Sequence, residues 1–280
     1  MDVFVPGGKI HTVNLGTSKK SLLVIHGGPD WDHSYLRSAG ELLSLNRKVI
    51  LFDIRGCGKS SKFEDISQYT IDNIVADIKC ILNAYGIACC DVLGFSFGGV
   101  VATHLLDQHP ELVDKLILAS TTCFEDYQDD LNGLPEYLDR NTPEIQNLVR
   151  YSFTKAPAID DEPSRTMALK TISLDVYDLD KLDSIKLTIE RVTFSSEWIK
   201  AFRKGLIKTK TLDGVEIVGR KNTNVLIIHG EKDFRFPVSA AIKLHGLLPK
   251  TKLVILADVG HLAHLEKQDK WVDEINKFLN

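Results

Sequence analysis

Residues 92–101 read Val92-Leu93-Gly94-Phe95-Ser96-Phe97-Gly98-Gly99-Val100-Val101. The apolar start predicts a buried strand, and the apolar spacing after the glycines predicts a helix that ends before Pro110. Glycines two residues before and two residues after Ser96 permit a tight, strained reversal with the hydroxyl at its tip, because a Cβ at either position would crowd the backbone. The strand-turn-helix context therefore predicts that Ser96 is a nucleophile.

A serine hydroxyl needs a base that takes its proton, and an acid holds that base in one tautomer. Two later apolar runs, at 225–228 and 253–256, lead into loops that carry Asp233 and His261. Open α/β sheets place their sites at the carboxyl ends of strands. We therefore predict a catalytic triad of Ser96, His261 as general base and Asp233 as the acid, in the order serine, acid, histidine along the chain.

Other uses of the residues near the predicted base are less favoured. Asp258 lies three residues before His261 on the same loop, which places it poorly to meet the imidazole ring from behind, so Asp233 is preferred. His261 and His264 have the spacing of one helix face and, with His229, form a conceivable set of metal ligands. The triad explains this region better, and we predict neither a metal nor a cofactor.

A second motif, Gly56-Cys57-Gly58-Lys59-Ser60, resembles the tail of a phosphate-binding loop. That motif needs a glycine five residues before Gly58, where this chain has Asp53. We therefore interpret the segment as a turn beside the active site.

Short apolar runs recur along the chain, with amphipathic helical patterns between several of them. The runs occupy residues 22–25, 49–52, 92–93, 116–119, 225–228 and 253–256. This alternation predicts a parallel sheet buried on both faces, preceded by an antiparallel hairpin at about residues 2–15. The alternation of apolar runs and helical patterns stops near Thr121 and resumes near Asn224. We predict a core formed by residues 1–120 and 223–280, and a helical cap formed by residues 121–222.

The composition is that of an ordinary globular protein, with 44% hydrophobic and 26% charged residues. A net charge of −4 argues against nucleic acid as a partner. The five cysteines lack metal-ligand spacing and are interpreted as reduced core residues. The longest nearly apolar run, Val92 to Ala102, is well short of the roughly 20 residues that span a bilayer. No basic and apolar leader opens the chain, so we expect a cytoplasmic protein without a membrane contact.

The chain resembles the capped enzymes of the α/β-hydrolase fold over essentially its full length. The resemblance rests on the turn at Ser96, on Asp233 and His261, on His26-Gly27-Gly28-Pro29, and on Asp53-Ile54-Arg55-Gly56-Cys57-Gly58-Lys59-Ser60. It implies a mostly parallel eight-stranded sheet flanked by helices, with an inserted helical cap. It also implies an oxyanion hole formed by the backbone amides of Gly28 and Phe97, each such donor contributing about 3 kcal/mol.

Three residues near the predicted nucleophile and in the loop after residues 22–25 indicate the class of substrate. The His-Gly-Gly-Pro segment also resembles prolyl aminopeptidases, which carry Gly-Gly-Ser-Trp-Gly around the nucleophile and a further glycine after the proline. This chain has Phe95, Phe97 and Asp30 at the differing positions. The two phenylalanines favour the esterase, lactonase and carbon–carbon hydrolase branches.

We therefore predict a serine hydrolase that cleaves a small carboxylic ester or a related acyl bond through an acyl-enzyme. A prolyl aminopeptidase-like exopeptidase remains an alternative, as does a carbon–carbon hydrolase or lactonase. A ligand receptor without turnover is an alternative from a different class, because a fold does not determine a function.

Trp31, Phe95 and Trp198 are the predicted walls of the substrate pocket, together with the side chain of Phe97. The acidic stretches of the predicted cap, at 125–130, 160–162 and 175–183, are interpreted mainly as solvated surface. We expect a small-molecule substrate. The sequence contains no motif that indicates the acyl-chain preference or the oligomeric state.

Overall fold

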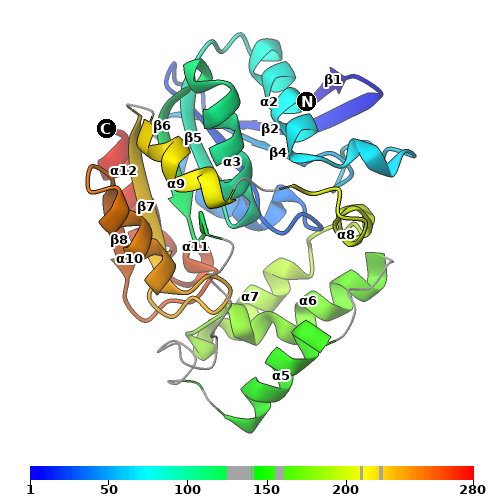
Figure 1. Cartoon of the computed structure of the whole chain (residues 1–280), viewed down its shortest axis with the longest axis vertical. Coiled ribbons are helices and arrows are strands. Elements are labelled where there is room, and N and C mark those ends of the chain that lie inside the picture. Colours follow the sequence, from blue (N-terminus) through cyan, green and yellow to red (C-terminus); the bar gives the residue numbers. More distant parts are fainter. Residues whose placement is uncertain (125–139, 141, 155–160, 209–210, 221–222) are drawn as a thin grey trace.

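The computed structural model describes residues 1–124, 140, 142–154, 161–208, 211–220 and 223–280. Its eight-stranded sheet has the order β1-β2-β4-β3-β5-β6-β7-β8 (Figure 1). The strands are β1 (Asp2–Val5), β2 (Gly8–Leu15), β3 (Ser21–Ile25), β4 (Lys48–Phe52), β5 (Cys90–Phe95), β6 (Val113–Ala119), β7 (Asn224–Gly230) and β8 (Lys252–Leu256). β2 pairs antiparallel with β1 and β4, and every other pair is parallel. The predicted sheet and hairpin are confirmed.

Helices cover both faces of the sheet because successive strand residues point to opposite sides. In β3, Leu23 and Ile25 pack into one apolar cluster, whereas Leu22 and Val24 pack into another. The first cluster includes residues of α2 (Ile71–Ala84), α3 (Phe97–Gln108) and α10 (Val238–Leu247). The second includes residues of α1 (Arg37–Leu43), α11 (Ala263–Glu266) and α12 (Gln268–Leu279). These layers fix the strand ends that carry the candidate site.

The described residues between β6 and β7 include five α-helices. They are α5 (Pro143–Thr154), α6 (Asp161–Asp175), α7 (Leu182–Ile189), α8 (Glu197–Arg203) and α9 (Thr211–Arg220). In Figure 1, α5, α6 and α7 lie together beyond the carboxyl end of the sheet, while α9 lies beside α3. Ile217 and Val218 of α9 belong to the same apolar cluster as α3. The division into a core and a cap at residues 121–222 stays a prediction, and α9 packs with the core.

Candidate active site

The turn at Ser96 joins β5 directly to α3. Ser96 has φ 53° and ψ −122°, a strained conformation for a residue with a side chain. A Cβ on Gly94 would lie 2.4 Å from the carbonyl oxygen of Gly98, and a Cβ on Gly98 would lie 2.1 Å from that of Ile25. Thr121 Oγ1 donates a hydrogen bond to the Ser96 carbonyl over 2.7 Å. Two glycines and this hydrogen bond therefore hold the serine at the tip of the turn.

The structure brings the three predicted triad residues together. His261 Nε2 lies 3.1 Å from Ser96 Oγ, and His261 Nδ1 lies 2.8 Å from Asp233 Oδ2. All three side chains are buried. Asp258, the alternative acid, is exposed on the histidine loop. The arrangement has the order that general-base activation of a serine requires.

The surroundings of Asp233 favour its ionised form. Its Oδ1 accepts hydrogen bonds from the backbone N–H groups of Arg235 and Phe236, over 2.8 and 2.9 Å. His229 Nε2 lies 3.3 Å from Oδ2. Burial acts to raise the pKa of Asp233, but the charges and hydrogen bonds of His261 and His229 outweigh it and hold that pKa well below its ordinary value. The aspartate is therefore ready to stabilise a protonated imidazole.

Two backbone amides, those of Phe97 and Gly28, are the predicted donors of the oxyanion hole. The Phe97 N–H opens α3, where the first N–H groups of a helix have no partner within the helix. Gly28 lies in the loop after β3 and lines the same cavity as Ser96. This loop is held by Tyr35, whose hydroxyl accepts a hydrogen bond from the Gly27 N–H over 2.8 Å. The assignment of Gly28 and Phe97 to an oxyanion hole stays a prediction.

Ser96 and His261 open into a cavity of about 320 Å³. Trp31 and Phe95, two of the predicted pocket residues, lie in its wall. Trp31 also packs edge-on against Tyr35, with ring centres 5.1 Å apart. The wall consists of Gly28, Asp30, Trp31, Tyr35, Phe95, Ser96, Ser164, Met167, Ala168, Thr171, Asp175, Ile199, Arg235, Phe236, His261 and Leu262.

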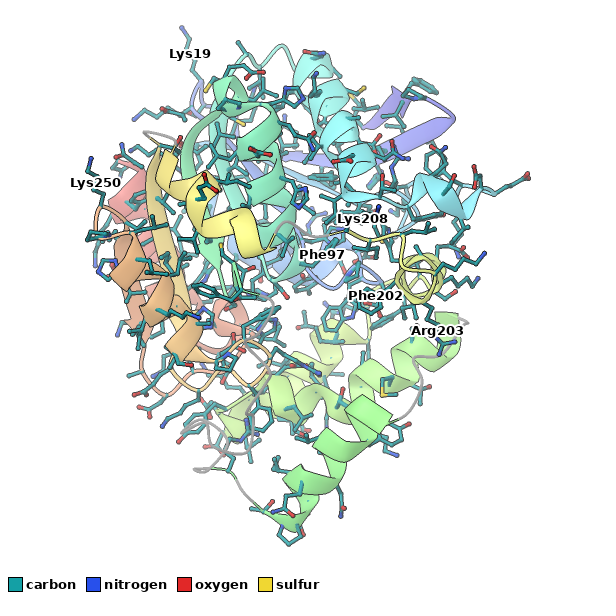
Figure 2. The ribbon with its side chains drawn as sticks, in the orientation of Figure 1. Lys19, Phe97, Phe202, Arg203, Lys208 and Lys250 are labelled. Atoms are coloured by element: carbon teal, nitrogen blue, oxygen red, sulfur yellow. The ribbon has the colours of Figure 1, made fainter. Side chains whose placement is uncertain are left out.

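The side chains of Trp198 and Phe97 do not line this cavity, contrary to the prediction. Trp198 is fully buried, and its indole N–H donates to the carbonyl oxygen of Arg55 over 2.7 Å. Its ring packs against Tyr69 and Phe97, with ring centres 5.5 and 5.9 Å away. Figure 2 shows Phe97 on the side of α3 that faces α8. Trp198 therefore anchors α8 to the core, and its neighbour Ile199 reaches the cavity instead.

Three charged residues of the cavity wall, Asp30, Asp175 and Arg235, were not assigned to the site from the sequence. Arg235 forms an ion pair with Asp175, to which its Nη2 donates over 3.1 Å, and the same nitrogen donates to Thr171 over 3.3 Å. Burial raises the pKa of Asp30 to about 6, while the charge of Arg235 acts in the opposite direction. Asp30 and Arg235 each lie two residues after a predicted site residue, and this proximity was the signal that could have indicated them. Asp175 carried none, because the acidic stretch around it indicated solvated surface.

Other sequence expectations concern metals, membranes and thiols. Among the described residues, no group of three His, Cys, Asp or Glu side chains is arranged to hold a metal ion. The helices that the structure describes include none with the length and apolarity to cross a bilayer. All five cysteines are free thiols. Cys57, Cys90 and Cys123 are buried as expected, whereas Cys80 is half-buried and Cys89, just before β5, is exposed.

Comparisons with known proteins agree with this fold. A family model described as alpha/beta hydrolase fold matches residues 20–268. A proline iminopeptidase of Lactobacillus crispatus is 24% identical over 94% of this chain and 91% of its own length. An esterase from Rhodococcus has a TM-score of 0.77 and 19% identity, covering 99% of this chain and 97% of that one. An enol-lactonase from Burkholderia xenovorans has a TM-score of 0.75 and 17% identity, covering 100% and 99%. These two solved structures share the fold of this chain.

Proposed function

This chain belongs to the α/β-hydrolase fold family, and from that premise we propose that it is a serine hydrolase that cleaves a carboxylic ester or a related acyl bond of a small molecule. The observation that carries the proposal is the hydrogen-bonded series from Ser96 through His261 to Asp233, with Ser96 and His261 in the cavity wall. A binding protein has no need of these three groups in this order.

In the first half of the reaction, Ser96 Oγ attacks the substrate carbonyl while His261 Nε2 takes the hydroxyl proton. Asp233 accepts the Nδ1–H and stabilises the imidazolium that forms. The N–H groups of Gly28 and Phe97 donate to the developing oxyanion. His261 then gives its proton to the leaving group, which departs and leaves an acyl group on Ser96.

In the second half, water enters the cavity and attacks the acyl-enzyme. His261 now takes a proton from this water and returns it to Ser96 Oγ as the tetrahedral intermediate collapses. The products are a carboxylic acid and the free enzyme. The whole scheme uses side chains and backbone groups of this chain, with no cofactor.

The test compares two serines of the same cavity wall, Ser96 and Ser164. Ser96→Ala should lower kcat for a short p-nitrophenyl ester by about 10⁶-fold and should prevent labelling by a fluorophosphonate, measured by intact mass. Ser164→Ala should keep the label, because its hydroxyl has no place in the series. Full labelling of Ser96→Ala would refute the proposal. Steady multiple turnover by the wild type would exclude a receptor without turnover.

A second candidate is an exopeptidase that removes an N-terminal residue, as the name of the Lactobacillus crispatus relative suggests. The observation that favours it is the Asp30 carboxylate in the cavity wall. With a pKa of about 6, this group is mostly ionised at neutral pH and suits a substrate ammonium. Asp30→Asn should raise KM for a prolyl arylamide and leave KM for a simple ester unchanged. No release from the prolyl arylamide by the wild type removes this candidate.

A further inference from the structure

The backbone N–H groups of the two residues that flank His261 are held by hydrogen bonds. The Gly260 N–H donates to Glu266 Oε1 over 2.8 Å. The Leu262 N–H donates to the carbonyl oxygen of Asp175, the last residue of α6, over 3.2 Å. The backbone that carries His261 is therefore bound through Glu266 on one side and through the end of α6 on the other.

Glu266 binds the same part of the molecule with its second oxygen. Its side chain is fully buried, and Oε2 accepts hydrogen bonds from the N–H groups of Tyr177 and Asp178, both over 2.8 Å. Its backbone carbonyl accepts a hydrogen bond from Lys181 Nζ. One carboxylate thus joins the histidine loop to the residues that follow α6 through three backbone donors, and such charge-assisted hydrogen bonds are strong.

The loop that carries the triad acid is tied to the same place. Arg235 donates its backbone N–H to Asp233 over 2.8 Å, and its guanidinium forms the ion pair with Asp175. Residues 175–178, here named the α6 strap, therefore contact the loops of both triad partners.

The contact between the α6 strap and the histidine loop is close. A Cβ on Gly260 would lie 2.6 Å from the carbonyl oxygen of Asp175 and 3.0 Å from the backbone nitrogen of Tyr177. α6 itself contributes residues to the cavity wall, among them Met167 and Thr171. The helix that faces the substrate space is thus joined at its end to the loops that hold the triad.

We propose that Glu266 is a positioning residue, and that the α6 strap, held by Glu266 and by the Asp175–Arg235 ion pair, makes the position of His261 depend on the position of α6. The inference rests on the proposed serine hydrolase function, in which His261 must meet both Ser96 and Asp233. A displacement of about 1 Å at a reacting group is enough to lower a rate about 10²-fold.

The main test is Glu266→Gln, which replaces one acceptor oxygen by an NH2 group facing a backbone N–H. We expect kcat for a p-nitrophenyl ester, per active site titrated with fluorophosphonate, to fall by about 10²-fold with little change in KM. Glu41→Gln is the matched control, because Glu41 only pairs with Arg37 on the surface of α1. A merely structural role for Glu266 would lower the melting temperature without lowering kcat per titrated site.

Proton NMR supplies a readout of the histidine itself. The His261 Nδ1 proton, assigned by its loss in Asp233→Asn, should shift or broaden in Glu266→Gln. The proton between His33 and Asp53, whose Nδ1 and Oδ1 lie 2.5 Å apart, should stay in place as an internal reference.

Wild-type kcat per site together with an unchanged His261 signal in Glu266→Gln would overturn the inference. If that variant does not fold, Lys181→Met replaces it, since it removes only the contact to the Glu266 carbonyl. We then expect a smaller loss of kcat in the same direction, and wild-type kcat would overturn the inference. Turnover retained by Ser96→Ala would instead refute the proposed function, so the two failures are distinguishable.

Discussion

His261–Asp233 and His33–Asp53 are two of the buried histidine–aspartate pairs that the structure describes. Of these two, His261–Asp233 is the one whose imidazole also meets a serine hydroxyl. His261 and Asp233 follow β8 and β7, with Nδ1 and Oδ2 2.8 Å apart, while Asp53 directly follows β4 and lies 2.5 Å from the Nδ1 of His33. Both aspartates have lowered pKa values. The pairs differ in that His261 Nε2 reaches Ser96 Oγ beside the cavity. The serine hydroxyl at the second ring nitrogen, more than the histidine–aspartate pair itself, therefore makes a candidate catalytic site.

The His33–Asp53 pair serves the architecture of the loops. Asp53 Oδ1 also accepts a hydrogen bond from the His33 backbone N–H over 3.1 Å, and Oδ2 accepts one from the Lys59 N–H over 2.9 Å. The carboxylate therefore joins the loop after β3 to the turn at residues 56–60, the one that resembles the tail of a phosphate-binding loop. The turn is thus held by an aspartate side chain, which agrees with its interpretation as a structural element.

The largest expected effect is a loss of kcat, and it distinguishes Asp233 from Asp53. Asp233→Asn should lower kcat by about 10⁴-fold, because the amide favours the wrong tautomer of His261. Asp53→Asn should keep most of the activity and instead lose about 2 kcal/mol of stability, because its partners lose a buried charged acceptor. Ester hydrolysis per titrated site and urea denaturation measure the two quantities. Equal losses of kcat in both variants would mean that the pairs do not differ as described.

An effect of intermediate size is expected for two tyrosines whose hydroxyl groups each accept a hydrogen bond from a backbone N–H group. Tyr35 binds Gly27 over 2.8 Å beside the predicted oxyanion hole, and Tyr69 binds Phe63 over 2.9 Å away from the cavity. Each Tyr→Phe change should cost about 1–3 kcal/mol, because a buried N–H is left unpaired. Only Tyr35→Phe should also lower kcat, by about tenfold. A similar loss of kcat in Tyr69→Phe would show that the loss of stability alone lowers the activity.

The smallest expected effect is a pH dependence of stability. Burial acts to raise the pKa of Asp53, but the hydrogen bond and charge of His33 outweigh it, so the folded pKa lies below the unfolded value of 3.8. The ionised form therefore stabilises the fold above that value, and this contribution disappears as the pH falls through the folded pKa. Between pH 5 and 3, the free energy of unfolding of the wild type should therefore fall more steeply than that of Asp53→Asn. Parallel curves from urea titrations would contradict the assignment.

The sequence allowed the sheet and the grouping of the triad residues to be predicted because their signals are local. A glycine on each side of Ser96 marks the turn, and apolar runs mark the strands whose ends carry Asp233 and His261. Parallel strands then bring these ends to one edge, whatever the details of packing. Asp233 was favoured over Asp258 on separate grounds, because Asp258 lies three residues before His261 on the same loop.

The remaining features depend on contacts between distant parts of the chain. Asp175 lies in an acidic stretch, and only its pairing with Arg235, 60 residues later, places it in the cavity. Glu266 has no motif, because two of the three backbone N–H groups that its carboxylate binds, those of Tyr177 and Asp178, lie almost 90 residues earlier. The large apolar side chain of Trp198 suits either the core or a pocket wall. The residue type alone does not indicate toward which of the two the side chain points. Such features follow from the packed fold and have no periodicity that a sequence displays.

The three tryptophans occupy very different environments. Trp198 and Trp271 are fully enclosed, whereas Trp31 lies in the cavity wall. An aqueous quencher that collides with indole rings therefore has one accessible emitter in this protein. A molecule that fills the cavity shields that emitter and alters its local polarity. The intrinsic tryptophan fluorescence of the unlabelled protein should therefore change when a molecule binds in the cavity. Trp31→Phe should abolish this change.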